Sequence, residues 1–116
     1  APLRAEKALS ARIDGMLKGV DDLYDGGTKP CLIASMLVGH RDDSLGKALS
    51  RILAEWVDTL GEALTEGGAS AREARERATR ALVQIEGALI LGRALGDKAL
   101  FARTLKDVKA MLVAGL

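Results

Sequence analysis

Few side chains in this sequence combine a reactive type with the spacing that chemistry requires. His40 stands in the charged stretch HRDD, a composition that could bind a metal ion or exchange a proton. It is the only histidine, and no cysteine or second histidine lies at zinc-ligand spacing from it. The sequence also has no nucleophile elbow, no phosphate-cradling glycine loop and no recognisable pair of inward-facing carboxylates. We therefore expect a solvated loop at His40, no metal or cofactor, no catalytic residue and no enzymatic activity.

Three other residues have both a chemical and a structural interpretation. Cys31, the single cysteine, lies near an expected helix start, where the helix dipole would lower the thiol pKa and favour reactivity. A buried, inert cysteine is the ordinary alternative, and we favour it. Gln84 and Glu86 interrupt an apolar stretch, where a buried polar group must find a partner. Either side chain could orient a ligand, cap a neighbouring backbone group or contact water at a helix seam.

Helical periodicity predicts the elements that would position these residues. Apolar residues recur at three- and four-residue spacing over residues 3–24, the pattern of an amphipathic helix, and the sequence DGG at 25–27 ends it. A short second helix would open at Thr28 or Lys29, with a proline in its first turn, and run to about Val38. The stripe of the first helix consists of Leu9, Ile13, Met16, Leu17, Val20 and Leu23.

Capping residues predict the remaining boundaries. Asp43 or Ser44 would cap a third helix, which ends at a Gly-Gly pair (67–68) that permits a left-handed C-cap. Ser70 has capping-box spacing to a glutamate and predicts the start of a fourth helix. The pair Gly-Asp at 96–97 separates the fourth helix from a last amphipathic one. No alternating strand pattern competes, so the predicted fold class is all-α, a five-helix bundle. The inner stripe of the last helix is Phe101, Leu105, Val108 and Leu112.

The fourth helix is apolar on two opposite faces. At about 100° per residue, one face holds Ala78, Ala81, Leu82, Ile85, Ala88 and Leu89, and the other holds Val83, Gly87, Ile90 and Ala94. A domain this small has one core, which only one face can serve. The second face would be enclosed by the rest of the domain or buried against another subunit. The small residues Gly87, Gly92 and Ala94 favour the subunit interface, because they let another helix approach closely.

A candidate ligand site follows from large, adaptable apolar side chains on separate helices. Met16, Met36 and Trp56 would suit the wall of a hydrophobic cavity between the first four helices, although plain core packing gives the same stripe. The predicted lining is Met16, Val20, Met36, Leu53, Trp56 and Leu60, with Gln84 as a polar contact.

Length and charge limit the class of protein. The 116 residues fit one domain with one core, and a net charge of +1 gives no strong attraction to a phosphate backbone. No apolar run approaches the roughly 20 residues of a membrane span, and the start has no signal-peptide pattern. We expect a soluble, cytoplasmic protein that makes no membrane contact and does not bind DNA by itself. The chain begins at Ala1 instead of Met, so we expect further sequence upstream.

Three stretches resemble the C-terminal domain of TetR-family repressors, especially the subgroup named for LmrA and YxaF. Residues 29–37 (KPCLIASML) are similar to a short helix of that family, in which a cysteine near the start is followed by small and apolar residues. Residues 53–56 (LAEW) are the second stretch. Residues 85–94 (IEGALILGRA) resemble the family's penultimate helix, and a last amphipathic helix follows at the expected distance.

The resemblance implies that residues 1–116 form an effector-binding and dimerisation domain. The last two helices would pair with their symmetry mates in a homodimer, and the preceding helices would enclose a small hydrophobic or aromatic effector. A helix-turn-helix domain before Leu3, absent from this chain, would bind operator DNA, and the effector would release it by changing the separation of the two recognition helices. A ligand-free helical dimerisation module is the alternative. The interface residues would be Val83, Gly87, Ile90, Ala94, Phe101 and Leu105.

Overall fold

The computed structural model describes residues 2–28 and 43–116, and the regular elements among these residues are all helical, with no strand. The elements are α1 (Pro2–Leu23), the 3-10 turn η1 (Asp25–Gly27), α3 (Ser44–Glu66), α4 (Ala71–Leu95) and α5 (Leu100–Val113). The all-α class is therefore confirmed, with four α-helices in the part of the chain described. The expected second helix, which includes Cys31 and Met36, and the expected loop at His40 both lie outside the described residues.

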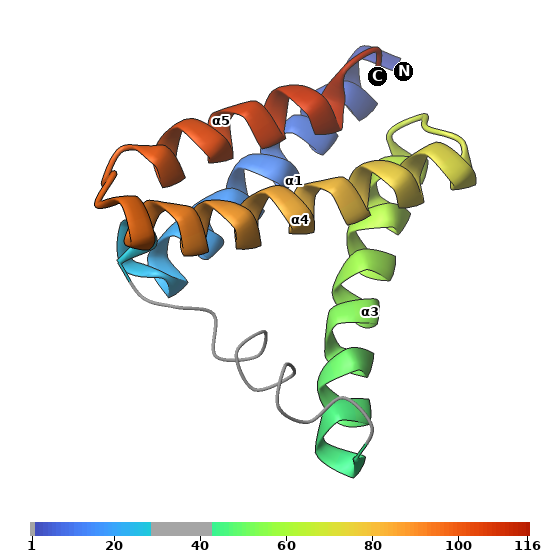
Figure 1. Ribbon diagram of the computed structural model, residues 1–116. Coiled ribbons are helices and arrows are strands. Elements are labelled where there is room, and N and C mark those ends of the chain that lie inside the picture. The colour runs from blue at the N-terminus through green and yellow to red at the C-terminus, as the bar shows by residue number, and fades with distance from the viewer. Residues whose placement is uncertain (1, 29–42) are drawn as a thin grey trace.

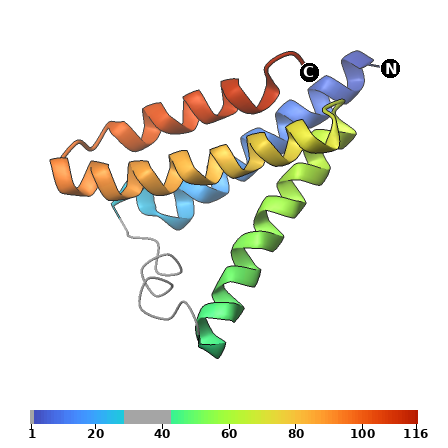
Figure 2. The same cartoon turned by 45° about the vertical axis from the view of Figure 1, so that its right-hand side comes forward.

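The helices form a layered arrangement around α4. Figures 1 and 2 show α4 and α5 side by side and antiparallel, with α1 lying along the same pair. α3 packs against α4 through its C-terminal half, and its N-terminal half projects away from the other described helices (Figure 1). The N-terminal and C-terminal ends lie near each other (Figure 1). This arrangement gives α4 a neighbour on either flank and leaves one long face of it outside the bundle.

The core is a single apolar cluster to which all four helices contribute. No polar or charged residue is fully buried among the described residues. Burial of each large aliphatic side chain stabilises the fold by roughly 1.5–3 kcal/mol, so the cluster fixes how the four helices sit against one another. The largest side chains that are almost completely buried are Ile13, Leu64, Ile85, Leu89, Val108 and Leu112.

Side-chain caps define the helix ends, as the sequence predicts. Asp43 Oδ1 accepts a hydrogen bond from the Gly46 amide at 2.8 Å, and Ser70 Oγ accepts one from the Glu73 amide at 3.1 Å. The left-handed residue after α3 is Gly68, with a φ of 114°, whereas the C-cap Gly67 is right-handed. The hydrogen bonds of Asp43 and Ser70 satisfy backbone amides that the first turns of α3 and α4 would otherwise leave unpaired.

The turn after α1 is fitted closely to the last two helices. Asp25, Gly26 and Gly27 have consecutive positive φ values of 48°, 66° and 93°. A Cβ atom at Gly27 would lie 2.6 Å from Phe101 Cβ on α5, so only glycine leaves room for this contact. The Arg93 guanidinium, near the end of α4, donates a hydrogen bond to the Thr28 carbonyl. These contacts tie the C-terminal end of α1 to both α4 and α5.

Candidate functional site

A cavity of about 210 Å³ lies between α1 and α3. Its floor consists of core side chains, since Ile13 is 1% exposed and Leu60 is 6% exposed. Met16 and Trp56 are partly buried and pack against the core. The structure thus brings together three residues of the predicted ligand site, Met16, Trp56 and Leu60, from two helices. The described lining is Arg12, Ile13, Met16, Trp56, Thr59, Leu60 and Ala63.

The polar groups of this cavity are on Arg12 and Thr59, neither of which is among the residues predicted to bind the ligand. Arg12 Nη1 forms an ion pair with Glu66 Oε2 on α3 at 2.6 Å, and both side chains are more than half exposed. No carboxylate is among the described lining residues. Because Arg12 stands four residues before Met16, the two share a helix face, and that spacing is the signal that could have identified it. The cavity therefore combines an apolar floor with one cation.

The other predicted lining residues lie elsewhere. Val20 is 9% exposed and belongs to the core cluster, and Leu53 is half-buried on α3. Neither is among the lining residues of the α1–α3 cavity. Met36 lies outside the described residues. The structure thus gathers only part of the predicted set at this one cavity.

Gln84 lies on the flank of α4 that faces α5. It follows Arg77 by seven residues, which places the two within about 20° of each other around the helix. Arg77 Nη1 donates a hydrogen bond to the Leu112 carbonyl of α5 at 3.0 Å. The Oε1 atom of Gln84 is buried and has no hydrogen-bond partner in the described structure. Gln84 is not among the residues that line the α1–α3 cavity.

The opposite flank of α4 faces α3 and the end of α1. Arg75 and Arg93 are eighteen residues apart, or five turns, and so share one line along the helix. Arg75 Nη1 pairs with Asp58 Oδ1 of α3 at 2.9 Å, and Arg93 reaches Thr28. Glu86 lies close to this same line, by the same helical count. Glu86 therefore lies on the flank of α4 that faces α3, whereas Gln84 lies on the flank that faces α5.

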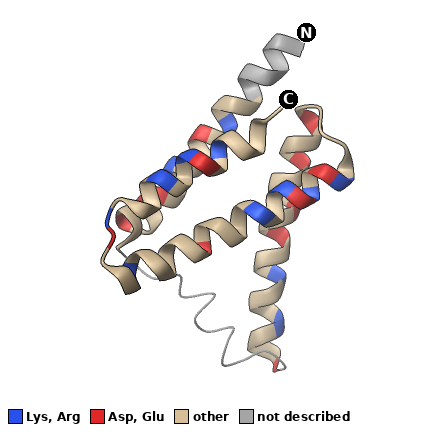
Figure 3. Ribbon diagram, turned by 45° about the horizontal axis from the view of Figure 1, so that its top comes forward, with Lys and Arg blue, Asp and Glu red and all other residues tan. Residues whose placement is uncertain are grey.

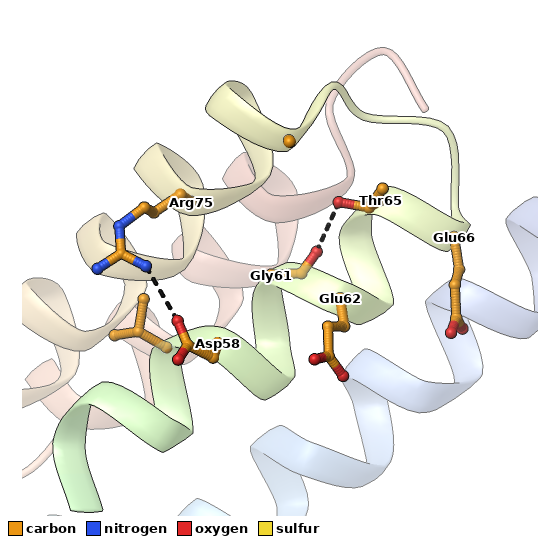
Figure 4. A pocket seen from close by; sticks show the side chains of 8 residues that line it. Asp58, Gly61, Glu62, Thr65, Glu66 and Arg75 are labelled. Carbon is orange, nitrogen blue, oxygen red and sulfur yellow. Dashed lines mark hydrogen bonds and ion pairs between the residues drawn. The ribbon is translucent and has the colours of Figure 1, made fainter. Parts of the chain in front are cut away.

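A second, open groove of about 520 Å³ separates α3 from the start of α4 (Figure 4). The ion pair between Arg75 and Asp58 crosses it, and Thr65 Oγ1 donates a hydrogen bond to the Gly61 carbonyl at 3.0 Å. Three α3 carboxylates at four-residue spacing line this groove. A polar, open groove offers an apolar compound little burial, so the α1–α3 cavity is the better candidate for such a ligand.

The outer face of α4 is apolar and exposed. On this face Val83 is 65% exposed and Ile90 64%. Leu91 (52%) and Leu95 (72%) are also exposed, but the helical count puts them beside the flank of Arg77 and Gln84. Ala94, on the same face as Val83 and Ile90, is also exposed, and Gly87 is partly exposed. Figure 3 shows that charged residues gather on the N-terminal half of α4, while its C-terminal half is largely uncharged. Val83 and Ile90 are large aliphatic side chains in contact with water on this face, beside the small residues Gly87 and Ala94, and an exposed apolar patch of this kind marks an interaction surface.

The predicted interface residues on the last helix lie on a different side. Phe101 is 2% exposed and Leu105 is 9% exposed, both within the chain's own core cluster. Phe101 also makes an edge-on contact with Tyr24, with ring centroids 6.4 Å apart. The inner stripe of α5 is therefore covered by this chain itself. The face of α5 open to a partner carries small and charged residues, namely Ala102, Arg103, Lys106, Asp107 and Ala110.

Asp97 is a charged residue outside the cavity, and its role is structural. Its Oδ1 atom accepts hydrogen bonds from the amides of Ala99 and Leu100, both at 3.1 Å, at the start of α5. Its Oδ2 atom pairs with Arg103 at 2.9 Å. The hydrogen bond from Arg103, helped by those from the backbone, lowers the pKa of Asp97. Asp97 thus caps the start of α5, and it lines neither the α1–α3 cavity nor the groove between α3 and α4.

Two kinds of site have no counterpart in the described part of the chain. No group of three or more His, Cys, Asp or Glu residues is placed there to hold a metal ion. No helix among the residues described is both long and apolar enough to cross a membrane.

The chain matches a family model over residues 5–107, which is most of its length. That model describes the C-terminal domain of LmrA/YxaF-like transcriptional regulators, a domain of the TetR type. The chain belongs to this family, and the resemblance found in its sequence is confirmed. Neither a curated protein nor a solved structure matches the chain.

Proposed function

We propose that the chain is the effector-binding and dimerisation domain of a TetR-type repressor, in which a separate helix-turn-helix domain binds operator DNA. The exposed apolar face of α4 is the observation that carries the proposal. A helix that keeps Val83 and Ile90 more than 60% exposed within its own chain gains stability by burying them against a second copy. If the proposal is right, the protein acts in the cytoplasm, where the operator DNA lies, and its role is regulatory and not enzymatic.

The α1–α3 cavity supports the effector-binding half of the proposal. A small apolar compound seated on Trp56 and Met16 would contact both α1 and α3. α1 is also tied to α4 and α5, because Phe101 packs on the turn that follows it and Arg93 holds Thr28. An effector that binds one arrangement of these helices more tightly would therefore shift α1 relative to the paired α4 helices. In a dimer, that shift changes the separation of two DNA-reading domains and releases the operator.

A ligand-free dimerisation module is the second candidate, and it shares the α4 face but not the need for a cavity. A thermal-shift screen with small aromatic and aliphatic compounds separates the two functions, because a ligand of the folded state raises the melting temperature as its concentration rises. Light scattering on the same samples measures the mass. The proposal predicts a particle of twice the 12.2 kDa chain mass and a saturable rise in melting temperature. A dimer that responds to no compound supports the module, and a monomer contradicts both functions.

A further inference from the structure

We propose that the α1–α3 cavity is built for a small apolar acid, with the body of the compound on Met16 and Trp56 and its carboxylate on Arg12. The inference rests on the proposed function, because it names the chemical class of the effector. Arg12 is the only charged residue among the described lining residues of this cavity.

The apolar lining and the volume of the cavity determine which ring and chain a ligand can have. Ile13 and Leu60 form a buried apolar floor, and Trp56 offers a flat ring surface at the side. A volume of about 210 Å³ lies below the roughly 300–1,000 Å³ of pockets for drug-sized compounds, so the cavity suits a compound of one ring with a short chain. Met16 can adjust its rotamer to such a ring.

The guanidinium of Arg12 determines the polar group of the ligand that the cavity would favour. Among the described residues, Arg12 makes one side-chain hydrogen bond, from Nη1 to Glu66 Oε2. The edge formed by Nε and Nη2 remains, and a planar guanidinium edge matches the two oxygens of a carboxylate. The Thr59 hydroxyl is the second polar group among the lining residues. An amide of the same shape would present an NH₂ group to a side chain that can only donate, and so would bind more weakly.

Substitution of Glu66 should affect binding of the acid in the direction opposite to substitution of Arg12. Glu66 pairs with Arg12 from outside the set of lining residues, and its side chain is 66% exposed. Its negative charge repels an incoming carboxylate and offsets the charge of Arg12. Removal of the Arg12 charge should therefore weaken the acid, and removal of the Glu66 charge should strengthen it. A ligand held by apolar contacts alone would respond to neither change.

Isothermal titration of the 116-residue chain with 4-phenylbutyrate and with 4-phenylbutyramide tests the inference. These probes share a phenyl ring and a chain and differ only in the head group. We expect the acid to bind about tenfold more tightly than the amide, the size of one charge-assisted hydrogen-bonded contact that is partly screened by solvent. Trp56, the only tryptophan, gives a second readout through its fluorescence.

Three variants complete the test. Arg12→Gln should bring the ratio of the two affinities to about one while leaving the amide unchanged, and Glu66→Gln should increase the ratio. Arg72→Gln is the matched control, because it removes an exposed arginine from an ion pair with Glu76 on α4, away from the cavity. It should leave the ratio as it is in the unaltered chain. Circular dichroism confirms that each variant folds.

Each outcome decides a different claim. Equal affinity for acid and amide, or an Arg12→Gln variant that keeps the wild-type ratio, overturns the inference and leaves the proposed function standing. Failure of both probes to bind while neutral apolar compounds bind also overturns it. Failure of every apolar compound in the thermal-shift screen counts against the proposed function itself.

Discussion

The substitution Ile90→Lys should break the dimer without unfolding the chain. Ile90 is 64% exposed on the outer face of α4, so most of its side chain is available to a partner. Full burial of an isoleucine is worth roughly 1.5–3 kcal/mol, and about two thirds of that is ~1–2 kcal/mol for each copy. A two-fold interface contains the residue twice, which gives ~2–4 kcal/mol for the dimer. Since 1.4 kcal/mol is a factor of ten, the dimer dissociation constant should rise by about 30-fold to 1,000-fold.

Sedimentation equilibrium over a range of concentrations measures this change. Ile52→Lys is the matched control, because Ile52 is an exposed isoleucine, 47% accessible, on α3 instead of α4. The control should keep the dissociation constant of the unaltered chain, and both variants should keep its helical content by circular dichroism. An Ile90→Lys variant that dimerises as tightly as the control would refute the assignment of the outer α4 face to the interface.

Three further predictions concern the parts of the fold that hold the site. Gly27→Ala should lower the free energy of unfolding by about 2–4 kcal/mol in a urea titration, because position 27 has a φ of 93° and a Cβ atom there would clash with Phe101. Gly26→Ala is the control: position 26 has a φ of 66° but open space around it, so the free energy of unfolding should fall by only about 1–2 kcal/mol. Asp97 has a lowered pKa in the folded state, so its stabilising contribution is complete above its ordinary unfolded pKa and is lost as the pH falls through the folded pKa. The melting temperature of Asp97→Asn should accordingly lie below that of the unaltered chain at pH 6, and the gap should close in acid. Gln84→Met should raise the free energy of unfolding by about 1 kcal/mol, because it removes a buried oxygen without a partner; an unchanged or lower value would show that this oxygen is satisfied in solution.

The two faces of α4 could be predicted from the sequence because helical geometry alone determines them. Ala81 and Ile85 are buried and Val83 and Ile90 are exposed, as the count of about 100° per residue requires. The same pattern cannot tell what covers an apolar stripe. Phe101 on α5 has the periodicity of an interface residue, but the chain's own core covers it. Telling these cases apart requires the positions of the neighbouring helices.

The polar part of the cavity could not be predicted from the sequence, because it too depends on how the helices are placed relative to one another. Arg12 and Glu66 are 54 residues apart, and no local spacing shows that α1 and α3 bring them together. Gln84 and Glu86 interrupt the same apolar stretch and appear equivalent in the sequence. They differ because α5 covers one flank of α4 and α3 the other, as the contacts of Arg77 and Arg75 show.

The pairing of two copies through α4 is the central claim, because effector control of a DNA-binding dimer depends on it. A spin label at Arg80→Cys, in a Cys31→Ser background that removes the only native cysteine, measures it directly by the distance between the two labels. Arg80 is exposed at the edge of the apolar face, about two turns from Gly87. Helices that cross near Gly87 at 8–10 Å should put the labels about 20–30 Å apart. A label pair beyond about 40 Å, or no dipolar coupling at all, would contradict the account.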